Sequence, residues 1–247
     1  MIKRNPKQDG SNLYDCVPQV GPCPVGCNQC FYNRPGAFYV PIDQPSIPTP
    51  EEVGDGIVRM NSGNDSNNQR ELVIETAARY KHAFFNTSLP TFDFPRPVVW
   101  TANPCEEQPV RIPPALATST PKNLMFVRLR VSSTNLRHIK LAADWFAMKH
   151  IPVVLTFMAY YEAEPQPPTD VLAAVGGPCY EWRVRHINSY HCPTAAFIRY
   201  VLGMFDGNRL VSYCGAFDNE GNCTPYCQFC RNCETFYYQS IKRMRGE

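Results

Sequence analysis

Short apolar runs alternate with amphipathic stretches along most of the chain. The runs are rich in Val, Ile, Leu and aromatic residues, as expected of strands buried on both faces. They lie at 13–17, 56–61, 82–89, 97–103, 124–131, 152–158 and 209–214. Helical spacing marks 67–81 and 134–150, and Glu51 and Glu52 behind Pro50 indicate a further short helix. Strands and helices in alternation predict a parallel sheet with right-handed crossovers.

The length of the chain limits how complete such a sheet can be. A full eight-fold barrel takes about 250 residues, and the chain has 247, many of them in loops and in a proline-rich connection at 33–50. We therefore expect an α/β fold, an incomplete (β/α)6 TIM-type barrel over residues 1–213. A short cysteine-rich extension at 214–247 follows it. Catalytic groups of such barrels lie at the carboxyl ends of the strands.

Charge and hydropathy exclude several classes of partner. Lys and Arg number 24 against 22 Asp and Glu, so the formal charge of +2 does not indicate a nucleic acid or an anionic membrane. The first thirty residues lack a signal-peptide pattern, and no run approaches 18 apolar residues. We expect a cytoplasmic protein without membrane contact. Twelve cysteines in such a chain favour metal binding or catalysis over a disulfide framework.

Three of these cysteines form a closely spaced group in the loop after the first predicted strand. Cys23, Cys27 and Cys30 are separated by three and then two residues, and the aromatic Phe31 follows. This spacing resembles the signature of radical S-adenosylmethionine enzymes. The resemblance extends over roughly residues 12 to 214 if the strand pattern is counted with it.

The resemblance implies a cofactor and a reaction. A [4Fe–4S] cluster normally takes four cysteine thiolates, so a loop that offers three would leave one iron open to the amino and carboxylate groups of S-adenosylmethionine. Enzymes of this family cleave S-adenosylmethionine reductively and abstract a hydrogen atom from their substrate. A one-electron donor such as flavodoxin or ferredoxin is then the expected partner, and the substrate is not identified by the sequence.

The same resemblance points to residues that would contact S-adenosylmethionine. Gly63, Asn64 and Asp65 follow the strand at 56–61, where the family carries a Gly-Gly-Glu-like motif. An ordinary turn explains the same residues equally well. By analogy, four further polar groups on strands could bind the cofactor carboxylate or ribose, although arginines are more often solvated or paired within the protein. These are Arg128, Arg130, Ser132 and Thr156.

A second cysteine group lies in the extension. Cys227, Cys230 and Cys233 resemble the first three ligands of a bacterial ferredoxin cluster, and either Cys214 or Cys223 could supply a fourth. Only fourteen residues follow Cys233, so no barrel remains to enclose a radical there. The group predicts an auxiliary site that holds either a second [4Fe–4S] cluster or a structural zinc ion.

Two alternatives remain open. The chain could be a zinc-stabilised binding protein without catalysis, with the CxxC pairs at 27–30 and 227–230 as its ligands. The remaining thiols could donate a hydrogen atom, ligate a metal, or simply be buried small residues, which is the default; among them are Cys105, Cys179 and Cys192. His186 and His191 are interpreted as polar residues satisfied within the protein.

Overall fold

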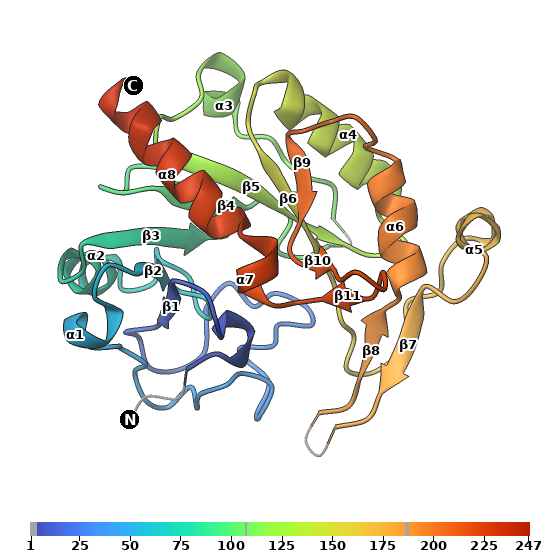
Figure 1. Ribbon diagram of the computed structural model, residues 1–247, viewed down its shortest axis with the longest axis horizontal. Coiled ribbons are helices and arrows are strands. Elements are labelled where there is room, and N and C mark those ends of the chain that lie inside the picture. Colours follow the sequence, from blue (N-terminus) through green and yellow to red (C-terminus); the bar gives the residue numbers. More distant parts are fainter. Residues whose placement is uncertain (1–3, 107, 186–187) are drawn as a thin grey trace.

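The computed structural model describes residues 4–106, 108–185 and 188–247, and a parallel sheet of seven strands lies at its centre (Figure 1). The strands pair in the order β1-β2-β3-β4-β5-β6-β9, and the sheet curls as a half-barrel. Their bounds are β1 (Leu13–Cys16), β2 (Ile57–Met60), β3 (His82–Thr87), β4 (Val98–Thr101), β5 (Leu124–Val131), β6 (Val153–Phe157) and β9 (Val211–Tyr213). Each falls within one of the seven predicted runs, so the α/β class and the parallel pairing are confirmed.

The connections between the strands are less regular than a (β/α)6 barrel. The predicted helices are present as α1 (Pro50–Val53), α2 (Arg70–Ala78) and α4 (Leu136–Met148), and three more are α3 (Pro114–Thr118), α5 (Thr169–Val175) and α6 (Ala195–Gly203). No helix joins β3 to β4 in this described stretch, because 88–97 contains three prolines that cannot continue helical hydrogen bonding. The sheet also has a seventh strand, so the six-unit repeat is matched only in part.

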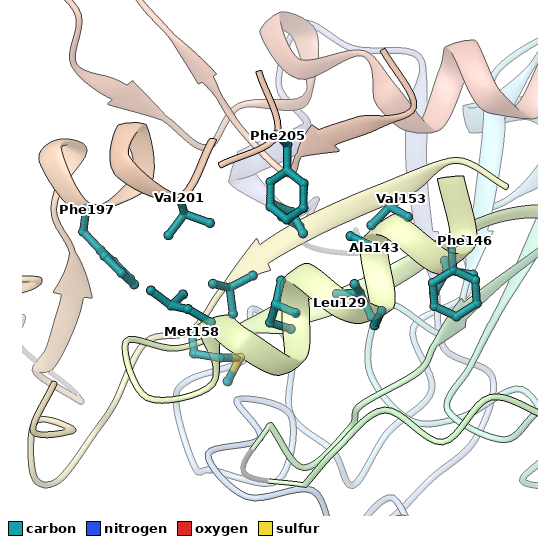
Figure 2. Close-up of a cluster of buried hydrophobic side chains, with 14 of the residues drawn as sticks. Leu129, Ala143, Phe146, Val153, Met158, Phe197, Val201 and Phe205 are labelled. Carbon is teal, nitrogen blue, oxygen red and sulfur yellow. The ribbon is translucent and has the colours of Figure 1, made fainter. Parts of the chain in front are cut away.

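The outer face of the sheet carries the largest hydrophobic core. Leu129 and Val153 on β5 and β6 pack against Ala143 and Phe146 of α4 and against the α6 segment. Figure 2 shows Phe197, Val201 and Phe205 pointing from α6 and the turn after it toward this core, with Met158 beside them. These side chains alternate along each strand with those of the inner face, as the period of two requires.

The inner face is covered by the end of the chain. Helix α8 (Asn232–Arg245) lies across β3, β4 and β5 in Figure 1. Its Tyr237 is 2% exposed and packs with Phe84 and Phe126 at the amino ends of the strands. A four-residue helix, α7 (Cys227–Cys230), precedes it. The cysteine-rich extension is therefore part of the core and not a free tail.

Two antiparallel hairpins and a short 3-10 helix complete the described structure. The hairpins pair β7 (Tyr180–Arg183) with β8 (Tyr190–Pro193), and β10 (Ala216–Phe217) with β11 (Cys223–Thr224). The 3-10 helix η1 (Pro6–Gln8) precedes β1. None of the helices in the described ranges is long and apolar enough to cross a membrane.

Candidate functional site

The cysteine-bearing loop between β1 and α1 is fastened to the carboxyl ends of the strands. At its start, Gln19 is fully buried; its Nε2 donates to the carbonyls of Asp65 and Asn68, and its Oε1 accepts from Asn61. Asn61, Asp65 and Asn68 all belong to the segment that leaves β2. The loop therefore lies at the edge of the sheet where active sites of parallel α/β folds are built.

A close approach between Tyr32 and Gly63 fixes the position of the cysteine group. The Tyr32 ring is 2% exposed, and its hydroxyl donates to the carbonyl of Gly21 at 3.2 Å. A Cβ at position 63 would lie 2.7 Å from Cε2 and 2.9 Å from Cγ of this ring, closer than side chains approach. Gly63 is required here for space. The turn after β2 thus supports the residue that lies two positions beyond Cys30.

Arg130, at the carboxyl end of β5, joins the loop to two other strands. Its Nη2 donates to the carbonyl of Asn28 at 2.9 Å, its Nη1 donates to the carbonyl of Pro104, and its Nε approaches the Met158 sulfur at 2.8 Å. The Glu106 carboxylate lies 3.5 Å from the guanidinium. Arg130 is 9% exposed. The residue predicted to bind a cofactor carboxylate already holds the cysteine loop in place.

The loop is also tied to the segment after β6. The Gln29 side-chain oxygen accepts from the backbone N–H of Tyr161 at 3.1 Å, and Gln29 itself has a left-handed backbone with φ of 52°. Arg34 reaches Glu162 at 3.1 Å across an exposed edge. The cysteine group is thus anchored to Arg130 near the end of β5 and to residues that follow β2 and β6.

The three thiols of this group are close enough to affect one another's ionisation. Burial raises the pKa of Cys23 to about 12, and the nearby Asp65, Cys30 and Cys27 act in the same direction. Burial also raises the pKa of Cys27 to about 11, against the opposing effect of the Arg130 guanidinium. Within the described ranges, no three His, Cys, Asp or Glu side chains are close enough to hold a metal ion as they stand. A metal would have to draw the thiols inward and displace their protons.

The Gly63-Asn64-Asp65 turn is held together by the Asp65 carboxylate. One carboxylate oxygen accepts from the N–H of Asn67 at 2.9 Å and from the Thr87 hydroxyl at 3.0 Å, and the other accepts from the N–H of Ser88 at 2.6 Å. Asp65 is 3% exposed. It joins the turn to the end of β3, whereas the buried amide nitrogen of Asn64 has no partner among the described residues. Contact of this turn with S-adenosylmethionine stays a prediction.

Of the other residues predicted to contact S-adenosylmethionine, only Thr156 has a buried polar side-chain atom without a hydrogen-bond partner in the part of the chain that the structure describes. Thr156 is in register with Arg130 on the neighbouring strand, and its buried hydroxyl has no partner in the described structure. Ser132 is 1% exposed and shares its hydroxyl with Thr134 at 3.0 Å. Arg128 lies deeper, beside the second cysteine group, and donates to the Asn86 side-chain oxygen at 3.3 Å.

Four cysteines of the extension converge on a small cavity on the inner face of the sheet. Its volume is about 20 Å³, and Arg59 and Arg128 also line it. We call its thiols the C-terminal cysteine group: Cys214, Cys227, Cys230 and Cys233. Cys223 is not among the residues that line the cavity, because β11 carries it away to the neighbourhood of Arg199 and Cys192.

The two arginines of the cavity differ in their partners. Burial works against the charge of Arg59, but the Asp15 carboxylate outweighs it and holds the pKa of the guanidinium well above its usual value. Arg128 has no such carboxylate within residues 4–106, 108–185 and 188–247, and burial lowers its pKa. The nearby thiols of Cys214 and Cys233 favour its charge most, the Asp15 carboxylate does so less, and the Arg59 guanidinium opposes it.

Cys214 and Cys230 act as a linked pair of thiols. Interaction with Cys230 lowers the pKa of Cys214 to about 5, in spite of burial, and Arg128 and Arg59 act in the same direction. The pKa of Cys230 is raised by the same interaction and by burial, as expected when two thiols share one proton. Cys214 is exposed to solvent and is also one of the residues that line the cavity.

The remaining cysteines and histidines lie outside these two groups. Cys16 and Cys179 are buried, Cys105 lies near Cys27, and none of the twelve thiols is in a disulfide. His191 lies 3.8 Å from Glu164, while His186 is outside the described residues. The CxxC pairs at 27–30 and 227–230 lie in different places, one beside Arg130 and the other on the cavity with Arg59.

Sequence reasoning missed the charged layer beneath the C-terminal cysteine group. Asp15 and Arg59 lie at paired positions on β1 and β2 and form an ion pair of 2.7 Å. A signal was present, since each is the one charged residue in an otherwise apolar strand. A charge in such a position is unusual unless it has a partner.

Comparison with protein-family models, with curated proteins and with solved structures finds no match.

Proposed function

We propose that the protein is a radical S-adenosylmethionine enzyme that uses a [4Fe–4S] cluster to act on a substrate not yet identified. The observation that carries the proposal is the placement of the loop of Cys23, Cys27 and Cys30. It is fastened over the carboxyl ends of parallel strands by Gly63 and Arg130. In this interpretation β1 to β6 form the incomplete six-unit barrel of residues 1–213, and β9 lies at its edge.

The residues present fit such a cofactor. Three thiols of one loop can ligate three irons of a four-iron cluster, which normally takes four cysteines. Among the buried polar atoms without a hydrogen-bond partner in the described residues are two potential donors near the loop, the Asn64 amide nitrogen and the Thr156 hydroxyl. These atoms can donate to the carboxylate or ribose oxygens of S-adenosylmethionine. When bound, the cluster and S-adenosylmethionine together would supply the one-electron chemistry for hydrogen abstraction.

The chain's own residues have defined tasks in this proposal. Arg130 holds the backbone of Asn28 and places a positive charge beside Cys27, which favours its thiolate. Tyr32 fixes the loop against the turn at Gly63. Asp65 keeps that turn joined to Thr87 and Ser88, which gives Asn64 a rigid support. The remaining requirement is a one-electron donor of the flavodoxin or ferredoxin type, in a cytoplasmic setting.

The test starts from full-length protein purified anaerobically and supplied with iron and sulfide. We expect about four irons that depend on Cys23, Cys27 and Cys30, a reduced-cluster resonance that S-adenosylmethionine alters, and formation of 5′-deoxyadenosine and methionine with dithionite. Joint replacement of the three cysteines by Ala should abolish all three results. Cys223→Ser is the matched control, because Cys223 lies outside both cysteine groups.

Two results would contradict the proposal. One is an iron content that the triple variant leaves unchanged. The other is colourless protein containing zinc alone, which would favour a zinc-stabilised binding protein without catalysis.

A further inference from the structure

The C-terminal cysteine group is built from three separate parts of the fold. Cys214 directly follows β9, Cys227 and Cys230 are the two ends of α7, and Cys233 lies in the first turn of α8. All four line the same cavity of about 20 Å³. This volume holds one or two waters or a single ion. The fold thus brings four cysteines to one small cavity, but no three of them in the described structure could hold a metal ion as they stand. Binding would draw the thiols inward around a single ion, and a four-iron cluster would also need the cavity to widen.

A backbone reversal at Arg231 makes the convergence possible. Arg231 has a left-handed conformation, φ 52° and ψ 3°, and separates α7 from α8. Its N–H donates to the carbonyl of Cys227 at 2.9 Å. The carbonyl of Tyr213 then accepts from Asn232 Nδ2 at 2.8 Å and from Cys230 Sγ at 3.8 Å. These contacts tie the helical cysteines to the end of β9, next to Cys214.

The two arginines that line the cavity, Arg59 and Arg128, favour a negatively charged group beside them. Asp15 balances Arg59, with Nε–Oδ1 2.7 Å and Nη2–Oδ2 3.1 Å. Arg128 donates to the neutral Asn86 and forms no ion pair with a carboxylate in the described part of the chain, since the nearby Asp15 is already paired with Arg59. A desolvated guanidinium without a counter-charge is unfavourable. The cavity therefore favours an occupant group of net negative charge.

We propose that Cys214, Cys227, Cys230 and Cys233 form a tetrathiolate metal centre whose counter-charge is Arg128. Four thiolates around Zn²⁺, or around an oxidised [4Fe–4S]²⁺ cluster, both carry a net charge of −2. On binding, the four thiols release four protons and form four metal–sulfur bonds, and no electron is transferred. This centre does not depend on the radical activity proposed above, because it uses none of Cys23, Cys27 and Cys30.

The competing interpretation is a redox-active pair made of Cys214 and Cys230, the two most strongly interacting thiols. That pair leaves Cys227 and Cys233 without a role, although both line the cavity. It also predicts one disulfide under oxidising conditions and no bound metal. The two interpretations therefore differ in what elemental analysis and thiol counting will find.

The experiment uses the full chain with Cys23, Cys27 and Cys30 replaced by Ala, purified anaerobically. We expect this protein to retain either one zinc, or about four irons whose resonance S-adenosylmethionine does not alter. Cys214→Ser or Cys233→Ser added to this background should remove that metal, whereas Cys223→Ser should retain it. Metal that survives loss of Cys214 and Cys233 would overturn the proposal. So would metal-free protein, either with all nine remaining thiols titratable or with a Cys214–Cys230 disulfide.

A second measurement guards against variants that simply fail to fold. Arg128→Gln retains all four thiols, so it should bind metal with roughly 10–100-fold lower affinity, the usual effect of losing an outer-shell partner. Arg128→Lys, which preserves the charge, should recover most of the affinity. The readout is competition with a chromophoric chelator, with circular dichroism to confirm folding. Equal affinity in folded wild-type and Arg128→Gln protein would exclude the counter-charge role.

Discussion

Asp15 and Arg59 face each other across neighbouring strands and form a two-point ion pair on the inner face of the sheet. The side chain of Asp15 is 1% exposed and that of Arg59 is 14% exposed. Asn5 Nδ2 and Gln8 Nε2 also donate to the same carboxylate, at 2.7 and 2.6 Å. The pair joins η1, β1 and β2 directly beneath the C-terminal cysteine group.

Replacing Asp15 by Asn should destabilise the fold strongly. The substitution leaves a buried guanidinium without its counter-charge, which costs about 3–5 kcal/mol in comparable pairs. Urea unfolding of the two proteins measures the difference. Asp55→Asn is the control, because Asp55 pairs with Lys81 on the exposed surface and such pairs contribute little. An equally small effect of both substitutions would show that the inner ion pair is not a stabilising element.

The contribution of Asp15 should also depend on pH. Burial opposes its ionisation, but Arg59 and the hydrogen bonds outweigh burial and lower the pKa of the carboxyl. The folded pKa is thus below the unfolded value of about 3.9, so the stabilisation is fully present above that pH and is lost as the pH falls through the folded pKa. The difference between wild-type and Asp15→Asn should therefore be constant from about pH 7 to 5 and shrink below about pH 4. A difference that persists unchanged at pH 2.5 would argue against this assignment.

Gly63→Ala should strain the cysteine loop through Tyr32. The added Cβ overlaps the Tyr32 ring, and overpacking of this kind costs about 1–3 kcal/mol. Gly177→Ala is the matched control, because a Cβ there meets no atom within 4 Å. Thermal and urea unfolding measure the effect, and the double variant with Tyr32→Leu should recover part of the loss. Equal stability of the two alanine variants would mean that the loop does not rest on this turn.

Arg130→Gln should loosen the loop around Asn28 while the sheet remains folded. The substitution removes the guanidinium bonds to the carbonyls of Asn28 and Pro104. A charged hydrogen bond contributes about 1.5 kcal/mol, which corresponds to roughly tenfold faster local exchange. Hydrogen exchange of a peptide spanning 23–34 in metal-free protein measures this change, with a peptide from α4 as the internal control. Lysine should not substitute, since a single ammonium cannot reach all of these acceptors.

Sequence patterns predicted the sheet well because its determinants are local. The run Leu124–Val131 is apolar and rich in branched residues, and it forms β5 with the expected bounds. The helix expected at 134–150 is α4, whose buried positions follow helical spacing. Proline explains why the repeat fails between β3 and β4. In these segments the spacing of apolar residues along the sequence largely determines whether a strand or a helix forms.

The candidate sites depended on contacts that the sequence does not encode locally. The choice between Cys214 and Cys223 rests on the β10–β11 hairpin, which turns only one of them toward the cavity. Arg128 and Arg130 are two residues apart on one strand, yet one lies beside each cysteine group. Spacing could group the cysteines, but it could not distribute the arginines between them. The two arginines reach different groups because Arg130 lies nearer than Arg128 to the carboxyl end of β5, where the first cysteine group is located.

The position of α8 has a consequence for how the protein is made. Residues 232–245 cover Leu13, Ile57, Phe84 and Phe126 on the inner face, so these apolar side chains stay uncovered while the ribosome is still adding the intervening chain. Synthesis proceeds at about 5–20 residues per second, so the roughly 120 residues from Phe126 to the end of α8 take about 6–24 seconds to add. During that interval the nascent sheet exposes an apolar surface, of the kind that chaperones bind. This period ends only when α8 has been synthesised and packs onto the sheet.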